Sequence, residues 1–173
     1  MRIIINTAFL IFTALNQVLS QTNFMVDEWR RAREYTKEYM DAMPEEGYAF
    51  KPVAEVKTFA QQYLHLALGN YHLVSTAINK PDPYAHLTGP DGYPKLETKA
   101  AVMKFVLDSY DYVIEGLRTL DETQLKDQVK FGTRSPTREQ LFFKVFEHQT
   151  HHRGQSAIYL RLKGVAPPAE KLF

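Results

Sequence analysis

The stretch LFFKVFEHQTHHRGQSAIYLRL, from Leu141 to Leu162, decides how this 173-residue chain folds. Apolar and histidine positions recur in it at spacings of four and three, the period with which an α-helix turns one face toward a core. The predicted inward stripe holds Leu141, Val145, His148, His152, Gln155, Tyr159 and Leu162. Two histidines therefore stand where such a stripe normally carries apolar side chains.

His148 and His152 are four residues apart, so on a helix their Cβ atoms lie about 5–6 Å from each other on one face. Two imidazoles in this arrangement can bind one metal ion, because a zinc–nitrogen bond is about 2.0–2.1 Å long. The competing interpretation is a pair of core histidines that only form hydrogen bonds. A metal centre also requires a third ligand from elsewhere in the chain.

The residues around this pair have distinct expected roles. His151 lies off the stripe and is expected at the surface. Glu147 points about 100° away from the ligand face, so we expect a solvated or salt-bridged acid rather than a general base. Gly154 is expected to permit close helix contact. Gln155, one turn beyond His152, could orient a ligand or a metal-bound water.

Composition excludes several classes of protein. The formal charge is +1 with no dense basic run, which argues against a nucleic-acid partner. Hydrophobic content of 45% and charged content of 24% are those of a soluble globular domain. The chain has no cysteine, so histidine, carboxylate or water must hold any metal.

The first twenty residues are typical of a secretory signal peptide. Arg2 is followed by an uncharged, largely apolar run from Ile3 to Leu19, and Val18-Leu19-Ser20 supplies a cleavage site before Gln21. We therefore expect a signal peptide at 1–20, an exported (periplasmic or secreted) domain at 21–173, and no membrane span in the mature form. If the peptide is not cleaved, the protein would be membrane-anchored.

Outside the histidine stretch, the chain shows helical periodicity and no convincing strand pattern. Helices are predicted at about 23–43, 56–79, 97–120 and 135–163, the last with Ser135 as its N-cap and Pro136 in its first turn. Four such amphipathic helices pack as an all-α four-helix bundle. The segment 80–97 is rich in Pro and Gly and is expected to be a long loop, either a plain crossover or a partial lid over the site.

The second predicted helix supplies two candidates for a third ligand. His65 and His72 lie two turns apart on it, and position alone does not separate them. His86, in the loop, is a weaker candidate. Metal sites in bundles are built from side chains on facing helices. Three nitrogen ligands with one open position would form a catalytic rather than a structural zinc site.

Three segments of the chain resemble the DinB/YfiT-like family of small four-helix metalloproteins. These are PVAEVKTFAQQYLHL at 52–66 with Asn70-Tyr71, EHQTHHRGQ at 147–155, and Pro167-Pro168. The resemblance covers nearly all of 24–173. It implies one metal ligand on the second helix and two on the fourth, namely His65, His148 and His152. Asn70 and His72 then join Gln155 as candidates for positioning the ligands.

The resemblance also implies chemistry. Such proteins carry one divalent ion, zinc or nickel, and homodimers are common among them. The better understood members use thiols such as bacillithiol or mycothiol for S-transfer, and many others are described only as metal-dependent hydrolases. Because those thiols are cytosolic, the apparent signal peptide favours a hydrolase acting on an unidentified small molecule. The alternatives are a thiol S-transferase or a non-catalytic metal- or ligand-binding module.

Overall fold

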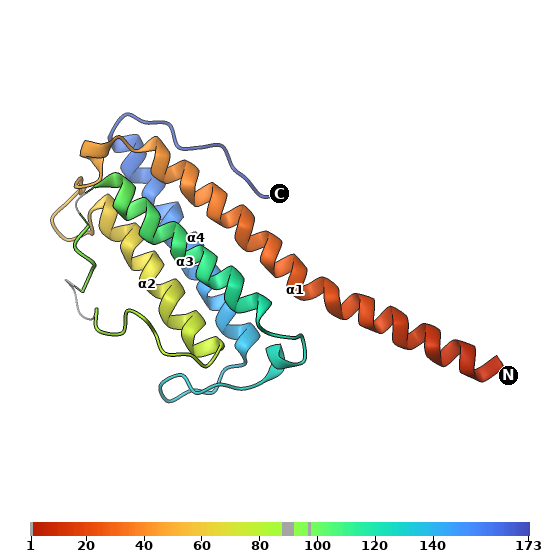
Figure 1. Cartoon of the computed structure of the whole chain (residues 1–173). Coiled ribbons are helices and arrows are strands. Elements are labelled where there is room, and N and C mark those ends of the chain that lie inside the picture. Colours follow the sequence, from red (N-terminus) through yellow and green to blue (C-terminus); the bar gives the residue numbers. More distant parts are fainter. Residues whose placement is uncertain (1, 88–91, 97) are drawn as a thin grey trace.

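The computed structural model describes residues 2–87, 92–96 and 98–173, with side chains from Gln21 onward, and its main elements are helices joined by loops (Figure 1). Its elements are α1 (Arg2–Ala42), η1 (Glu45–Gly47), α2 (Phe59–Ala77), α3 (Lys99–Arg118), η2 (Gln124–Lys126) and α4 (Arg138–Leu162). No strand occurs in these ranges, where β-pairing is limited to isolated bridges between η2 and α4. The predicted all-α fold of four main helices is confirmed.

Helix α1 differs from the prediction at its start. A first helix was expected from about residue 23, whereas α1 begins at Arg2, and its first half projects beyond the bundle (Figure 1). From Met25 onward the same helix buries Val26, Trp29 and Ala32 against the other helices. Among the described residues, no helix combines the length and apolar character needed to cross a membrane.

The core is aromatic and lies between the four helices. Helix α2 packs against both α3 and α4, and α1 packs mainly on α3. The largest fully buried side chains include Trp29, Phe59, Tyr63, Tyr110 and Phe142. Trp29 meets Tyr110 edge-on at 5.6 Å between ring centroids, so aromatic contacts join α1 to α3 at the middle of the core.

Side-chain caps fix where α2 and α4 begin. Thr58 and Gln61 form a reciprocal capping box at the start of α2. At α4 the same device uses Thr137 and Gln140, so the predicted cap at Ser135 was wrong. The sequence carries the reason, because Thr137 has a glutamine three residues later whereas Ser135 has an arginine.

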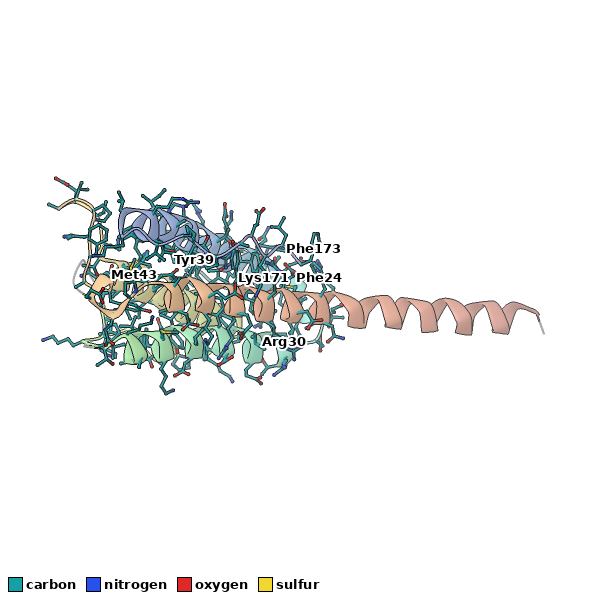
Figure 2. The ribbon with its side chains drawn as sticks, turned by 90° about the horizontal axis from the view of Figure 1, so that it is seen from above. Phe24, Arg30, Tyr39, Met43, Lys171 and Phe173 are labelled. Atoms are coloured by element: carbon teal, nitrogen blue, oxygen red, sulfur yellow. The ribbon has the colours of Figure 1, made fainter. Side chains whose placement is uncertain are left out.

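The chain end and a buried arginine tie α1 to α4. The C-terminal segment returns along α1, and Figure 2 shows Lys171 beside it, where the Lys171 carbonyl accepts a hydrogen bond of 2.5 Å from Arg31. Arg153 of α4 is buried, donates to Gln149 Oε1 at 2.7 Å and lies 4.5 Å over the ring of Tyr35. The contact of Arg153 with Tyr35 therefore joins α4 to α1.

Candidate metal centre

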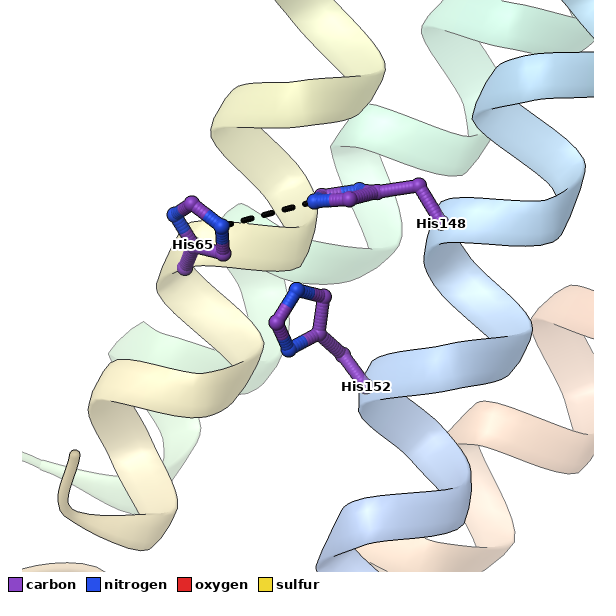
Figure 3. A group of neighbouring side chains, drawn as sticks. All are labelled: His65, His148 and His152. Atoms are coloured by element: carbon purple, nitrogen blue, oxygen red, sulfur yellow. Dashed lines mark hydrogen bonds between the residues drawn. The ribbon is translucent and has the colours of Figure 1, made fainter. Parts of the chain in front are cut away.

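Three imidazoles from two facing helices meet at one point (Figure 3). His65 comes from the middle of α2, and His148 and His152 come from the middle of α4. One ring nitrogen of each lies within 4.8 Å of the others, and His152 is buried whereas the other two are half-buried. His72, the competing candidate for third ligand, lies outside this cluster, as does His86.

One pair of these nitrogens has the spacing of two ligands on a small divalent ion, and the three together lie within 4.8 Å. Two ligand atoms bound at about 2.0–2.1 Å to a tetrahedral centre lie about 3.3–3.4 Å apart. The Nε2 atoms of His65 and His148 face each other at 3.4 Å. The described residues that form the cluster are all histidines, a donor set that suits zinc, nickel or another transition metal rather than calcium or magnesium.

A chain of hydrogen bonds orients His152. Its Nδ1 lies 2.9 Å from Oε1 of Gln62, and a carboxamide oxygen can only accept, so Nδ1 carries the hydrogen. The Gln62 amide donates to the Tyr159 hydroxyl at 3.1 Å, and that hydroxyl donates to the Lys57 carbonyl at 2.7 Å. This chain leaves Nε2 of His152 with a free lone pair, the tautomer that a metal ligand needs.

The ring of His148 is positioned mainly by close packing. Its ring lies over Gly69 of α2, and a Cβ at Gly69 would come within 2.4 Å of Cε1 and 2.6 Å of Nδ1. The Nδ1 atom of His148 is buried and has no hydrogen-bond partner among the described residues. Close packing against a glycine therefore sets the position of this ring, together with the hydrogen bond of 3.4 Å between its Nε2 and Nε2 of His65 (Figure 3).

Burial keeps the three rings neutral. It lowers the pKa of His152 to about 3 and that of His148 to about 4, with smaller contributions from the neighbouring imidazoles. Burial also lowers the pKa of His65, and Lys57 adds to the effect. Neutral rings offer lone pairs to a cation, so the metal-free site is ready for an ion at neutral pH.

The flanking residues divide into confirmed and wrong predictions. His151 is exposed, and Glu147 is an exposed acid paired with Lys144 at 2.8 Å, both as predicted. Gly154 is exposed, and an added Cβ there would meet nothing within 4 Å, so its predicted role in close helix contact was wrong. The glycine that makes room in the site is Gly69.

The three positioning candidates lie in other surroundings. Gln155 is exposed on α4 rather than inward-facing. Asn70 is buried and donates to Ser109 of α3 at 3.0 Å. His72 is exposed and pairs with Asp82 at 3.3 Å. The hydrogen-bond partner of a cluster histidine is instead Gln62, which accepts from His152 and which the periodicity of the sequence did not single out. Gln62 and Gly69 lie three residues before and four after His65, on the same face of α2.

A cavity of about 370 Å³ opens beside His65. One wall is a face of α2, and the other comes from residues of the loop after it, among them Asp82, Tyr84 and Leu87. This size is within the range of small-molecule sites, about 300–1,000 Å³. The segment 80–97 thus borders the site, although residues 88–91 and 97 lie outside the described ranges.

Known proteins are similar to this chain in sequence and in fold. YjoA of Bacillus subtilis (strain 168), an uncharacterized protein, is 25% identical over 150 residues, which are 84% of this chain and 93% of YjoA. The fold matches a DinB-like protein from Bacillus cereus ATCC 10987 (TM-score 0.69, 17% identity, 84% of this chain and 95% of that one). It also matches a conserved protein from Enterococcus faecalis (TM-score 0.69, 17% identity, covering 82% of this chain and 96% of that one). The DinB family model matches residues 18–172, so the chain belongs to the DinB family.

Proposed function

We propose that this protein is a metal-dependent enzyme, most simply a hydrolase of a small molecule, that holds one zinc or nickel ion on His65, His148 and His152. The observation that carries the proposal is the convergence of three neutral imidazole nitrogens within 4.8 Å on two facing helices. A divalent ion there would lower the pKa of a bound water or thiol, or polarise a substrate oxygen.

The surroundings of the cluster support catalysis rather than a sealed structural site. His65 borders a cavity, and two of the three rings are half-buried, so a substrate can reach the cluster from one side. Gln62 holds His152 in the required tautomer, which is the kind of support that metal ligands in enzymes receive. Three protein ligands would leave one position of a tetrahedral ion for water or substrate.

A metal assay tests the first half of the proposal. Elemental analysis of the purified protein should find about one divalent ion per chain, as three ligands around one point require. His65→Ala, His148→Ala and His152→Ala should each lose tight binding, whereas His72→Ala, an exposed histidine outside the cluster, should retain it. Unchanged stoichiometry in any of the three ligand variants would exclude the site.

Turnover assays test the second half. The metal-loaded protein would be screened against esters, amides, and pairs of a low-molecular-weight thiol with an electrophile. Hydrolysis that His152→Ala abolishes supports the main proposal, and thiol-dependent turnover supports the S-transferase alternative. Among the described residues the cluster consists of three ligand histidines without a carboxylate, which favours the third candidate, a metal- or ligand-binding module. Metal binding without turnover on any panel would support that module.

We also propose that residues 1–20 are removed as a signal peptide and that the mature protein is exported. Cleavage before Gln21 would place the new amino group where the Gln21 backbone nitrogen now lies, 3.1 Å from a carboxylate oxygen of Glu122. An ammonium at that position gains a charged partner. Intact mass of the exported protein should correspond to a chain beginning at Gln21. The homodimer stays a prediction, which light scattering of the purified protein would test.

A further inference from the structure

One face of α2 connects the histidine cluster to a second polar group. His65, Leu68, Gly69 and His72 follow each other at helical spacing, and all line the cavity of about 370 Å³. Seven residues at a rise of about 1.5 Å each place His72 about 10.5 Å along the helix axis from His65. The cavity therefore has the histidine cluster near one end and His72 near the other.

The second polar group is a histidine fixed by a carboxylate. His72 Nδ1 lies 3.3 Å from Oδ2 of Asp82, whose side chain is only 15% exposed. The other oxygen of Asp82 accepts a hydrogen bond of 2.8 Å from the Tyr84 backbone N–H, so the loop holds the carboxylate in place. An ionised carboxylate only accepts, which puts the hydrogen of a neutral His72 on Nδ1 and leaves Nε2 as an acceptor.

The wall between these two ends is largely apolar. Leu68 of α2 faces the cavity from one side, and Ala85 and Leu87 of the loop line it from the other, with the ring of Tyr84 beside them. The ring of Phe131, which is not part of the cavity lining, packs 5.9 Å from that of His72. A ligand that is apolar along its middle would suit this lining, which also includes Tyr93.

We propose that His72, held by Asp82, determines specificity by accepting a hydrogen bond from the end of the substrate farthest from the metal. This inference rests on the proposed metal site. The substrate class it defines is an elongated molecule of about 10 Å. It carries a metal-reactive group at one end, an apolar body, and a hydroxyl or another hydrogen-bond donor at the other end.

Linear hydroxamates are suitable probes, because the hydroxamate chelates zinc and the chain length can be varied. Calorimetry on the zinc-loaded full chain would compare chains of graded length that end in methyl, in hydroxyl, or in methyl ether. At the length that spans the cavity, the hydroxyl compound should bind about three- to ten-fold more tightly than the other two, the gain expected from one hydrogen bond partly open to water. The ether gains nothing because it has no hydrogen to donate.

Three variants separate this role from a structural one. His72→Phe should abolish the preference for hydroxyl while the methyl compound binds unchanged. Asp82→Asn can donate to Nδ1 and so move the ring hydrogen to Nε2, which should narrow the difference between hydroxyl and ether. His86→Phe, an exposed loop histidine outside the cavity lining, is the matched control and should keep the wild-type preference.

The outcomes distinguish the two proposals. If the wild-type protein binds neither zinc nor nickel, the metal site is overturned, and this inference is overturned with it. Two results would overturn the inference while the metal site stands, provided that every variant binds zinc at wild-type stoichiometry. One is that the wild-type protein does not prefer the hydroxyl compound at any chain length. The other is that His72→Phe still prefers it. Failure of all hydroxamates to bind the zinc-loaded protein would also overturn it.

Discussion

Replacing Gly69 by alanine should disrupt the proposed metal site while leaving the fold intact. A Cβ at Gly69 would lie 2.4 Å from Cε1 of His148, whereas ordinary contact begins at 3.4 Å, so the ring must withdraw by about 1 Å. Metal–ligand distances tolerate only about ±0.2 Å. His148 therefore cannot remain a ligand together with His65 and His152.

The magnitudes separate the two effects. Loss of one of three ligands should weaken zinc binding by at least about 100-fold. Removing only a residue that hydrogen-bonds to a ligand already lowers metal affinity by up to about that factor. On stability, alanine in a helix interior gains about 1 kcal/mol over glycine. Displacing the His148 side chain from its rotamer costs about 0.5–1.5 kcal/mol. These nearly cancel, so the melting temperature of the metal-free protein should change by no more than about 2–4 °C.

The assay compares two glycines. Zinc affinity would be measured by competition with a chromogenic chelator, and thermal unfolding would be followed after removal of metal. Gly154→Ala is the matched control, because Gly154 is also inside a helix but is exposed, with nothing within 4 Å of an added Cβ. It should bind zinc like the wild type and melt about 2–4 °C higher, the effect of helix propensity alone.

A double variant makes the test stricter. If Gly69 acts only through His148, then Gly69→Ala with His148→Ala should bind zinc no worse than His148→Ala alone. Additive losses would show that alanine at position 69 disturbs α2 itself. Wild-type zinc affinity in a folded Gly69→Ala protein would refute the reasoning, because His148 would then not need the space that it occupies over this glycine.

Two further predictions concern Gln62 and pH. Gln62→Leu should weaken zinc binding about 10–100-fold, because His152 Nδ1 loses the acceptor that fixes its tautomer. Gln61→Leu, at the adjacent position of α2, would serve as a control for zinc binding although it removes a cap contact. The unfolded chain takes up protons at its histidines below pH of about 6.5, whereas His148 and His152 in the folded metal-free protein resist protonation down to pKa values of about 4 and about 3. The free energy of unfolding, measured by urea titration after metal removal, should therefore be independent of these two rings above pH of about 6.5 and should fall as the pH is lowered from there to about 5. His148→Leu should lessen that slope, and an unchanged slope would contradict the burial argument.

Periodicity predicted much of this structure because helices and their stops are local features. A helix does not continue through Pro44 or through the prolines at 81 and 83, because proline lacks the backbone N–H and clashes with the preceding turn. The i,i+4 spacing of His148 and His152 likewise needs no tertiary information. The choice of His65 over His72 was not local. It came from family resemblance, and the structure brings His65 to the pair while His72 lies outside the cluster.

The error at Gln155 has a geometric cause. A seven-residue repeat drifts by about 20° per repeat on a straight α-helix. Along Leu141, His148, Gln155 and Leu162, the side chains accordingly pass from buried through half-buried to exposed. The buried face of α4 instead includes Gln149, Arg153 and Ser156, and tyrosines of other helices hydrogen-bond to two of these polar side chains. Polar residues whose partners lie on another helix cannot be recognised as core from periodicity.

The same drift explains why the cluster is accessible. His152 lies well inside the buried face of α4, and His148, one turn earlier, lies at its edge. A pair centred on the face would have been sealed in the core, where a metal could stabilise the fold but meet no substrate. With His148 at the edge and His65 bordering the cavity, the cluster is half open. His152 hydrogen-bonds to Gln62, whereas His148 packs against Gly69. Substitutions at Gln62 and at Gly69 should therefore weaken metal binding by independent routes.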